Sequence, residues 1–291
     1  MDLKGRDFLK LTDLSKEELL DIVYLSMDLK RKRVHRSDLA GKSLAMLFAK
    51  TSTRTRVSFE VAMTELGGHA LNLKWAETNF VKGDIRDESR VLSRYCDAIM
   101  ARLYEHKDLL AIADASKKPV INGMDDEHHP CQALADIMTI IEAKGDPGGL
   151  RVAWIGDATN VFLSLSQAAN MLAMSTVIAV PEGYEHDRVA GAEVVRDPAE
   201  AAGDADVLVT DTWVSLGQEA EKKQRLRDFK GYTIDLDLLD AAAEDAIVLH
   251  CLPAQRGYEI TADVLESPQC LAFDEAENRL HTSKALLLSV V

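Results

Sequence analysis

Short apolar runs alternate with stretches of helical periodicity along nearly the whole chain. The first helix is predicted by the capping box of Ser15 and Glu18, which precedes apolar residues recurring from Leu19 to Leu25. The same pattern predicts strands at residues 43–49, 70–74, 98–102, 119–121, 150–155, 176–180, 207–210 and 246–250, and helices at 54–66, 88–95, 107–115, 129–144, 161–172, 219–229 and 275–291. Because strands that alternate with helices build parallel sheets covered on both faces, we expect an α/β fold.

A Gly- and Pro-rich segment, Gly145-Asp-Pro-Gly-Gly149, divides this alternation into two halves. A chain of 291 residues is long enough for two domains of ordinary size. We therefore expect two doubly wound domains with parallel central sheets, linked by the helix at 129–144. The first comprises residues 1–132, with the final helix at 275–291 packing back onto it, and the second comprises residues 133–274.

Composition and charge narrow the class of protein. Apolar residues make up 47% of the chain and charged residues 28%, as expected for a folded domain. The formal net charge of −14 argues against nucleic acid or an anionic membrane as a partner. No apolar stretch approaches the roughly 18 residues of a transmembrane helix, the N-terminus lacks the apolar core of a signal peptide, and the four cysteines form no C-x-x-C pair. These features predict a cytoplasmic protein with free thiols and no zinc or redox motif.

Polar residues follow the predicted strands at the points where those strands end. Six such clusters are present: Ser52 to Thr55, Arg102, His129 to Gln132, Gly156 to Asn160, Asp211 to Ser215 and His250 to Pro253. In open α/β sheets, ligands bind outside the carboxyl ends of the strands. A purely structural protein has no need of Arg, His, Cys and Asp at these places. The pattern therefore predicts a binding site in a cleft between the two domains.

The segment Thr51-Ser-Thr-Arg-Thr-Arg56 carries the most specific chemistry. It lies between a predicted strand and a predicted helix, where unpaired backbone N–H groups and the helix dipole favour an anion. The hydroxyl residues of this segment add donors, and Arg54 and Arg56 add fixed cations. A phosphate or acyl phosphate is the expected ligand, and a capped helix with two solvated arginines is the structural alternative.

Most of these residues also have a structural explanation when taken singly. The loop from Gly156 to Asn160 lacks G-x-G-x-x-G, which argues against a nicotinamide site. Taken alone, His129 could be an ordinary residue at a helix N-terminus, Cys251 a buried core thiol, and Asp211 a turn or helix-cap residue. Arg279 could pair with Glu275 on the surface, and the charged residues at 221–230 could form a solvated helix face. Because the polar clusters all fall at the ends of predicted strands, together they favour a functional site over these structural explanations.

Longer motifs match a known family in order along nearly the whole chain. They are Ser52-Thr-Arg-Thr-Arg-Val-Ser-Phe-Glu60, Glu65-Leu-Gly-Gly-His-Ala70, Arg90-Val-Leu-Ser-Arg94, His129-Pro-Cys-Gln-Ala-Leu-Ala-Asp136, Asp211-Thr-Trp-Val-Ser-Leu-Gly217, His250-Cys-Leu-Pro-Ala254 and Phe273-Asp-Glu-Ala-Glu-Asn-Arg-Leu-His281. With them the chain resembles the aspartate/ornithine carbamoyltransferase family, and within it the ornithine carbamoyltransferases. The resemblance implies carbamoyl transfer from carbamoyl phosphate to the δ-amine of L-ornithine, giving L-citrulline and phosphate in arginine biosynthesis. It implies no metal and no organic cofactor.

The resemblance also assigns a carbamoyl phosphate site to the strand-end clusters. It implies that residues Ser52, Thr53, Arg54 and Thr55 hold the phosphate. Arg102 then bridges phosphate and carbonyl oxygens, while His129 and Thr55 donate to the carbonyl oxygen. The other implied carbamoyl phosphate residues are Asn79 and, around the carbamoyl NH2 group, Gln132, Cys251, Leu252 and Arg279.

The implied ornithine site consists of Asn160, Asp211, Ser215 and Leu216, with Asp211 near the α-ammonium and Cys251 beside the δ-nitrogen. Arg102, His129, Asp211 and Cys251 are the implied catalytic residues. The δ-amine must lose a proton before it attacks, because its pKa resembles the value of about 10.4 for lysine. Either Cys251 or the leaving phosphate accepts that proton. The family forms homotrimers with sites at subunit borders, so a trimer or a multiple of trimers is expected.

Several positions depart from the family pattern, and two of them belong to the implied site. Asn79 stands where the family usually carries a Gln, often supplied by a neighbouring subunit, and Leu216 replaces the usual Met of the ornithine loop. The alternative functions are carbamoyl transfer to putrescine or aspartate, and a non-catalytic carbamoyltransferase-like binding protein. Asp211 suits a substrate with an α-ammonium, which putrescine lacks, and a second carboxylate on the substrate would need added cations there. The intact Arg54 and Cys251 disfavour the binding protein.

Overall fold

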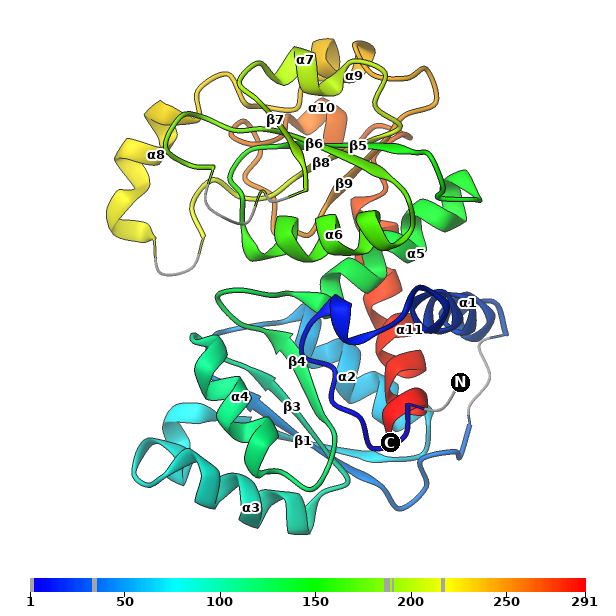
Figure 1. Ribbon diagram of the computed structural model, residues 1–291, viewed down its shortest axis with the longest axis vertical. Coiled ribbons are helices and arrows are strands. Elements are labelled where there is room, and N and C mark those ends of the chain that lie inside the picture. The colour runs from blue at the N-terminus through cyan, green and yellow to red at the C-terminus, as the bar shows by residue number, and fades with distance from the viewer. Residues whose placement is uncertain (1–2, 33–35, 186–188, 190, 216–217) are drawn as a thin grey trace. The chain divides into compact units, whose positions relative to one another are not determined.

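The computed structural model describes residues 3–32, 36–185, 189, 191–215 and 218–291 (Figure 1). The chain forms two compact units, the first Met1–Met138 with Glu277–Val291 and the second Thr139–Ala276. Each unit contains an all-parallel sheet flanked by helices, which confirms the predicted fold class. The boundaries between the units fall inside two long helices, α5 (Pro130–Lys144) and α11 (Ala272–Val290).

The first unit contains a four-stranded parallel sheet in the order β2-β1-β3-β4. The predicted capping box begins its first helix, since the Glu18 amide donates to Ser15 Oγ and the Ser15 amide donates to the Glu18 carboxylate. Its helices and strands are η1 (Leu11–Asp13), α1 (Lys16–Lys32), β1 (Ser43–Phe48), α2 (Arg54–Glu65), β2 (His69–Lys74), η2 (Trp75–Glu77), η3 (Asn79–Val81), α3 (Ile85–Tyr95), β3 (Ala98–Arg102), α4 (His106–Ala115) and β4 (Val120–Met124).

The central strands of the first sheet are buried on both faces. Ala45, Leu47 and Ile99 form one core cluster with Leu109 and Ile112 of α4. Successive residues of a strand point to opposite faces, so the side chains between them, which are also fully buried, serve the other face. Figure 1 shows α3 and α4 on one side of this sheet and α2 on the other. Continuous apolar runs such as 44–47 are the expected result of this double coverage.

The second unit contains a five-stranded parallel sheet in the order β7-β6-β5-β8-β9. Its helices and strands are β5 (Arg151–Ile155), α6 (Asn160–Met171), β6 (Ser175–Ala179), β7 (Glu193–Val195), α7 (Pro198–Ala202), β8 (Val207–Thr210), η5 (Glu219–Glu221), α8 (Lys222–Asp228), α9 (Leu236–Asp240), β9 (Ile247–His250) and α10 (Ala262–Leu265). Figure 1 shows α6 on one face of the sheet and α7, α9 and α10 on the other.

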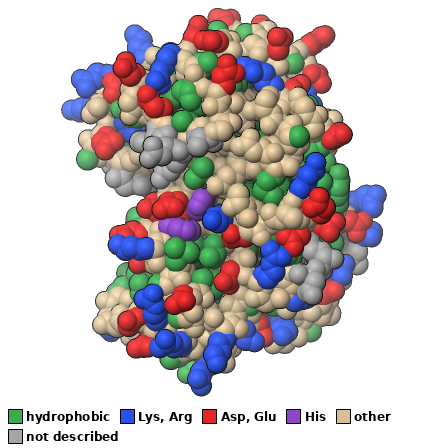
Figure 2. Space-filling view, in the orientation of Figure 1, with side chains coloured by type: hydrophobic (Ala, Val, Ile, Leu, Met, Phe, Trp, Pro, Cys, Tyr) green, Lys and Arg blue, Asp and Glu red, His purple; other side chains and the backbone are tan. Residues whose placement is uncertain are grey.

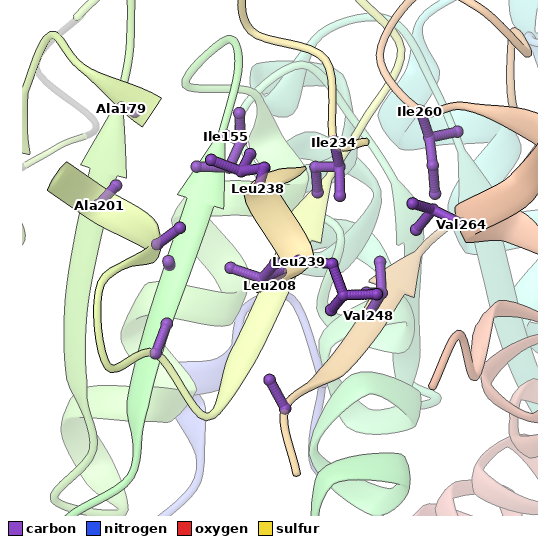
Figure 3. Packing of buried hydrophobic residues seen from close by; sticks show 14 of the residues in the cluster. Ile155, Ala179, Ala201, Leu208, Ile234, Leu238, Leu239, Val248, Ile260 and Val264 are labelled. Atoms are coloured by element: carbon purple, nitrogen blue, oxygen red, sulfur yellow. The ribbon is translucent and has the colours of Figure 1, made fainter. Parts of the chain in front are cut away.

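Side chains of β5 show how this sheet is packed on both faces. Ile155 points into the cluster formed with Leu238 of α9 and Val264 of α10 (Figure 3). The neighbouring Trp154 points the opposite way, and its ring lies 5.4 Å from the ring of Phe162 on α6. The sheet therefore carries one apolar layer on each face, and its strand ends are left to present polar residues.

Several elements differ from the predicted ones. β4 continues through Met124, so Asn122 lies in a strand and not in a loop. Its side-chain amide donates to the Asp125 carboxylate. The predicted helix at 219–229 is shorter and divides into η5 and α8. The elements β7, α7, α9 and α10 are too short for periodicity to detect. Among the described residues, no helix is long and apolar enough to cross a membrane.

Candidate active site

Each sheet contains a point where its strand order reverses, and four of the six polar clusters follow the strands at these two points. In the first sheet the chain runs from β1 to β2 on one side and then continues with β3 on the other side of β1. In the second sheet the same reversal falls between β5 and β8. Open α/β sheets bind ligands at the carboxyl ends of such strand pairs. The turn before Arg54 and the residue Arg102 follow the first pair, and Gly156–Asn160 and Asp211 follow the second.

The N-terminus of α2 has the features of an anion site. Its first turn carries no acidic residue, and the Thr55 amide donates to Ser52 Oγ at 3.3 Å. Arg54 is half-buried, whereas Arg56 is exposed and pairs with Glu60 one turn further on, at 3.4 Å. The dipole of the helix favours a negative ligand at this end. The two arginines of the motif therefore have different roles, and only Arg54 is a candidate for the site.

Buried polar residues of the first unit, from α2, β3, α11 and the start of α5, contact one another near this helix N-terminus. Arg279 of α11 is 2% exposed, and its guanidinium donates to Thr55 Oγ1 at 3.1 Å and to Oε1 of the Gln132 side chain. Arg102 at the end of β3 is also buried, with Nη1 3.5 Å from His129 Nε2. Acidic and basic side chains are interspersed on the surface drawn in Figure 2. In an acidic protein, buried arginines gathered in one place indicate an anionic ligand.

His129 is a neutral imidazole in this setting. Burial, reinforced by the positive charges of Arg279, Arg102 and Arg54, holds its pKa well below the ordinary value of 6.5. A neutral imidazole carries one N–H, which can donate to a carbonyl oxygen without transferring its proton. Each of the three arginines thus lies near enough to His129 for its charge to act on the pKa of that ring.

Acidification is expected to destabilise the protein through its buried histidines. Burial lowers the pKa of His128, His129 and His281 below 6.5, so the unfolded chain binds protons that the folded chain rejects. The free energy of unfolding therefore decreases as pH falls below about 6.5, by about 1.4 kcal/mol per pH unit for each proton. Urea unfolding of wild type and His129→Gln at several pH values measures this slope. The slope should be smaller in the variant, and an equal slope would contradict the account.

Lys50 is a candidate residue that the sequence motifs do not reveal. It is 9% exposed, with its ammonium 4.8 Å from the centre of the Tyr104 ring. Burial and the positive charge of Arg102 lower its pKa. A cation held this close to Arg102 adds to the positive potential at the end of β1. In the sequence, Lys50 is marked only by its position between the first predicted strand and the polar cluster of residues 52–55.

Asn79 does not join this group in the single chain. It begins η3 and is exposed, and no contact among the described residues links its side chain to Arg102 or His129. Its carbonyl oxygen accepts hydrogen bonds from the amides of Lys82 and Gly83. The structure of one chain therefore leaves the side chain of Asn79 available to another partner.

In the second unit, a carboxylate and a thiol meet at the switch point. Cys251 Sγ donates to Asp211 Oδ1 at 3.1 Å, and Thr159 Oγ1 donates to Asp211 Oδ2 at 3.2 Å. The Thr212 amide also donates to Asp211 Oδ1, at 2.7 Å. Thr210 and His250 are direct partners in the pairing of β8 with β9, which explains why the residues that follow them are neighbours. The structure thus brings Asp211 and Cys251 together, although 40 residues separate them.

Buried hydrogen bonds fix the backbone around Cys251. His250 Nδ1 accepts from the Leu252 amide at 2.8 Å, and His250 Nε2 lies 3.1 Å from the Glu259 carboxylate. Nδ1 accepts a hydrogen bond, so Nε2 carries the proton and donates it to Glu259. Leu252 has a φ of 53°, a left-handed conformation that is costly for a branched residue and persists only where its surroundings impose it. These contacts therefore hold the backbone at residues 250–252 in one conformation.

Arg225 supports the segment that follows Asp211. It is 3% exposed and donates to the Trp213 carbonyl oxygen and to the Asp157 carboxylate, which is also buried. The Trp213 ring stacks between those of Phe229 and Tyr258. The interpretation of residues 221–230 as a solvated face is therefore wrong for Arg225. Its burial follows from a tertiary partner 68 residues away, which local charge pattern cannot reveal.

The structure describes two of the other three residues assigned to an ornithine site, Asn160 and Ser215. Asn160 is the first residue of α6, and Thr159 caps that helix by accepting from the Phe162 amide. The Ser215 amide donates to the side chain of Gln218 at 3.0 Å. Leu216 lies outside the described residues.

Both halves of the chain match domain models of one protein family. Residues 6–142 match the model of the aspartate/ornithine carbamoyltransferase carbamoyl-P binding domain. Residues 148–290 match the model of the Asp/Orn binding domain of the same family. Together the two models span nearly the entire sequence.

Individual relatives are similar over the same length. The ornithine carbamoyltransferase of Methanoculleus marisnigri is 48% identical over 299 residues, covering 98% of this chain and 97% of that protein. That of Pyrococcus abyssi is 48% identical over 305 residues, covering 99% and 96%. The solved structure of ornithine carbamoyltransferase from Pyrococcus furiosus is similar with a TM-score of 0.94 and 46% identity, covering 100% of this chain and 98% of that one. The chain therefore belongs to the aspartate/ornithine carbamoyltransferase family.

Proposed function

We propose that the protein transfers the carbamoyl group of carbamoyl phosphate to the δ-amine of L-ornithine, giving L-citrulline and phosphate. The observation that carries the proposal is the gathering of Arg54, Arg102 and Arg279 around a neutral His129 in an acidic protein. Relatives that are 47–48% identical over nearly the full length bear the name ornithine carbamoyltransferase, which supports ornithine as the acceptor. The name of the Pyrococcus furiosus relative includes the word anabolic, which supports a role in arginine biosynthesis.

The proposed carbamoyl phosphate domain comprises residues 1–132 and the final helix at 275–291, which lie largely in the first unit. Ser52, Thr53, Arg54 and Thr55 hold the phosphate at the N-terminus of α2, where amides, hydroxyls and a guanidinium converge. Arg102 bridges the phosphate and carbonyl oxygens. The contacts of Arg279 with Gln132 and Thr55 support a shared role for these residues at the carbamoyl end. The family resemblance adds Cys251 and Leu252 to the residues proposed for that end.

The proposed ornithine-binding domain comprises residues 133–274, which lie largely in the second unit. The Asp211 carboxylate is the partner of the α-ammonium, and Asn160, Ser215 and Leu216 complete the binding of the amino acid head. The contact of Cys251 Sγ with Asp211 supports a place for the thiol beside the bound substrate. Thr159 holds the second oxygen of Asp211, which keeps the carboxylate oriented before ornithine binds.

Transfer requires the uncharged δ-amine to attack the carbamoyl carbon. Negative charge then grows on the carbonyl oxygen, where Arg102, His129 and the Thr55 hydroxyl stabilise it, and one such donor is worth roughly 3–4 kcal/mol. The C–O bond to phosphate breaks, and Arg54 balances the charge of the departing phosphate. The amine proton passes either to Cys251 or to the leaving phosphate.

We further propose that the protein is a cytoplasmic homotrimer in which Asn79 completes the carbamoyl phosphate site of a neighbouring subunit. The exposure of Asn79, away from its own chain's Arg102 and His129, supports this arrangement. Sedimentation equilibrium should give three chains, or a multiple of three, per particle. A monomer that is fully active in the same buffer would contradict the shared site.

Replacing Asp211 by Asn should weaken ornithine binding more than carbamoyl phosphate binding. The variant loses the charge that pairs with the α-ammonium, and a hydrogen bond to a charged group contributes about 1.5–3 kcal/mol. kcat/KM for ornithine should therefore fall by roughly 10- to 150-fold. The KM for carbamoyl phosphate should change much less. Steady-state citrulline formation with each substrate varied in turn measures both values.

Asp204→Asn is the matched control for this experiment. Asp204 is exposed in the same unit and has a φ of 56°, a conformation that Asn tolerates well. The control removes the same charge and should leave both kinetic constants close to wild type. If Asp211→Asn impaired the two substrates equally, the division into a carbamoyl phosphate half and an ornithine half would be wrong.

A further inference from the structure

Two histidines and a glutamate meet beside the carboxyl ends of β3 and β4. His106 begins α4, directly after β3, and Glu127 and His128 follow β4. One ligand atom from each of the three residues lies within 4.8 Å of the others. The strands β3 and β4 are neighbours in the sheet, so the loops that follow them emerge side by side. On the face drawn in Figure 2, histidine side chains reach the surface beside acidic ones.

A buried carboxylate orients the first of these histidines. Asp125 Oδ2 lies 2.6 Å from His106 Nδ1, and Asp125 is fully buried. The same carboxylate accepts hydrogen bonds from the Asn122 side chain and from the amides of Glu127 and His128, so it is an acceptor only. His106 Nδ1 must therefore carry the proton, which leaves Nε2 as the free lone pair of the neutral ring. Histidines that bind metals are held in this way by a carboxylate behind the ring.

The second histidine is also prepared to act as a ligand. His128 is 7% exposed, and its Nδ1 makes no hydrogen bond to any described residue. Its ring stands edge-on to the ring of His106, with centres 5.2 Å apart. Its Nε2 lies 3.9 Å from a carboxylate oxygen of Glu127, which is exposed and accessible to an ion from solvent.

We propose that His106, Glu127 and His128 bind one divalent transition-metal ion of the zinc class, with water in the remaining position. Two imidazoles and one carboxylate are a recurring donor set for zinc, and imidazole disfavours magnesium and calcium. Metal–nitrogen distances of about 2.0–2.1 Å require the three side chains to close by small rotations. The site is not a part of the transfer reaction. It would join the loop after β3 to the loop after β4, directly before His129.

Cobalt titration of the full-length, chelator-treated protein tests the proposal. Wild type should bind one Co2+ per chain, with visible d–d absorption and without a thiolate-to-metal band in the near ultraviolet. His106→Gln and Glu127→Gln should each weaken binding by at least about tenfold. Glu127 is exposed, so its variant should fold even if the His106 variant does not. Zn2+ should also raise Tm in wild type but not in these variants.

Two control variants separate this site from other metal ligands on the chain. His69→Gln removes an exposed imidazole of the same unit and should leave the affinity unchanged. Cys251→Ser removes the partly exposed thiol and should also leave it unchanged. The proposal is wrong if Cys251→Ser abolishes binding, if a thiolate band is present, or if His106→Gln and Glu127→Gln bind as tightly as wild type.

Discussion

Replacing Arg54 by Ala should lower kcat/KM for citrulline formation by at least about 10²- to 10³-fold while the protein remains folded. The guanidinium lies at the N-terminus of α2, whose first turn carries no acidic residue, and its charge acts on the pKa of His129. In the proposed site it is the forked cation that faces the leaving phosphate. Alanine is a strong helix former, so α2 should persist, and circular dichroism and Tm check this. Initial rates of citrulline formation with both substrates varied measure the loss.

Arg56→Ala is the control for this variant, because the same side chain is removed from the same helix. Arg56 is exposed and engaged with Glu60, a surface pair that contributes only about 0.3–0.5 kcal/mol. Its activity should stay near that of wild type. Equal losses in the two variants would mean that general positive charge, and not one positioned guanidinium, binds the phosphate. Wild-type turnover in Arg54→Ala would refute the phosphate assignment.

Replacing Arg225 by Leu should destabilise the protein by about 3–5 kcal/mol, the usual result of removing one partner of a buried ion pair. The change leaves the Asp157 carboxylate buried without its cation and frees the Trp213 carbonyl oxygen. The segment after Asp211 then loses its support, so the KM for ornithine should rise as well. Urea unfolding and ornithine kinetics on the same preparation measure the two effects.

Arg227→Leu provides the control, because Arg227 lies two residues further along α8 and is exposed. Its stability should change by no more than about 0.5 kcal/mol. Adding Asp157→Leu to Arg225→Leu should restore part of the lost stability, since the unpaired carboxylate is then removed. If Arg225→Leu were as stable as Arg227→Leu, the buried pair would have no structural role.

The strand-end clusters could be predicted because their cause is local. A short apolar run followed by Ser, Thr and Arg marks both the end of a strand and the start of a helix. Parallel sheets then place such ends at one edge, which is why Arg102 was expected beside the phosphate turn. The order of the strands in the sheet, which places the phosphate turn and Arg102 at a switch point, could be learned only from the structure. Periodicity predicts where strands lie in the sequence but not which strands are neighbours.

Contacts between distant parts of the chain could not be derived from local pattern. Arg279 and Glu275 are spaced for a surface pair, yet Arg279 is buried against Thr55, 224 residues away, and Glu275 accepts from the His250 amide. Only the family resemblance suggested a site role for Arg279. Arg225 sits in a highly charged segment, and nothing in that segment distinguishes it from its exposed neighbours. Burial of a charge depends on a tertiary partner, and a partner is not a property of the local sequence.

The most direct test of the central claim is to offer wild-type protein carbamoyl phosphate with ornithine, putrescine and aspartate in parallel, and to measure the ureido product. The account predicts rapid formation of citrulline with ornithine and at most a trace of product with the other two amines. Putrescine cannot pair with Asp211 through an α-ammonium, and aspartate brings a second carboxylate to a place where the protein presents an acid. Equal or faster turnover with either of those amines, or no product with ornithine, would contradict it.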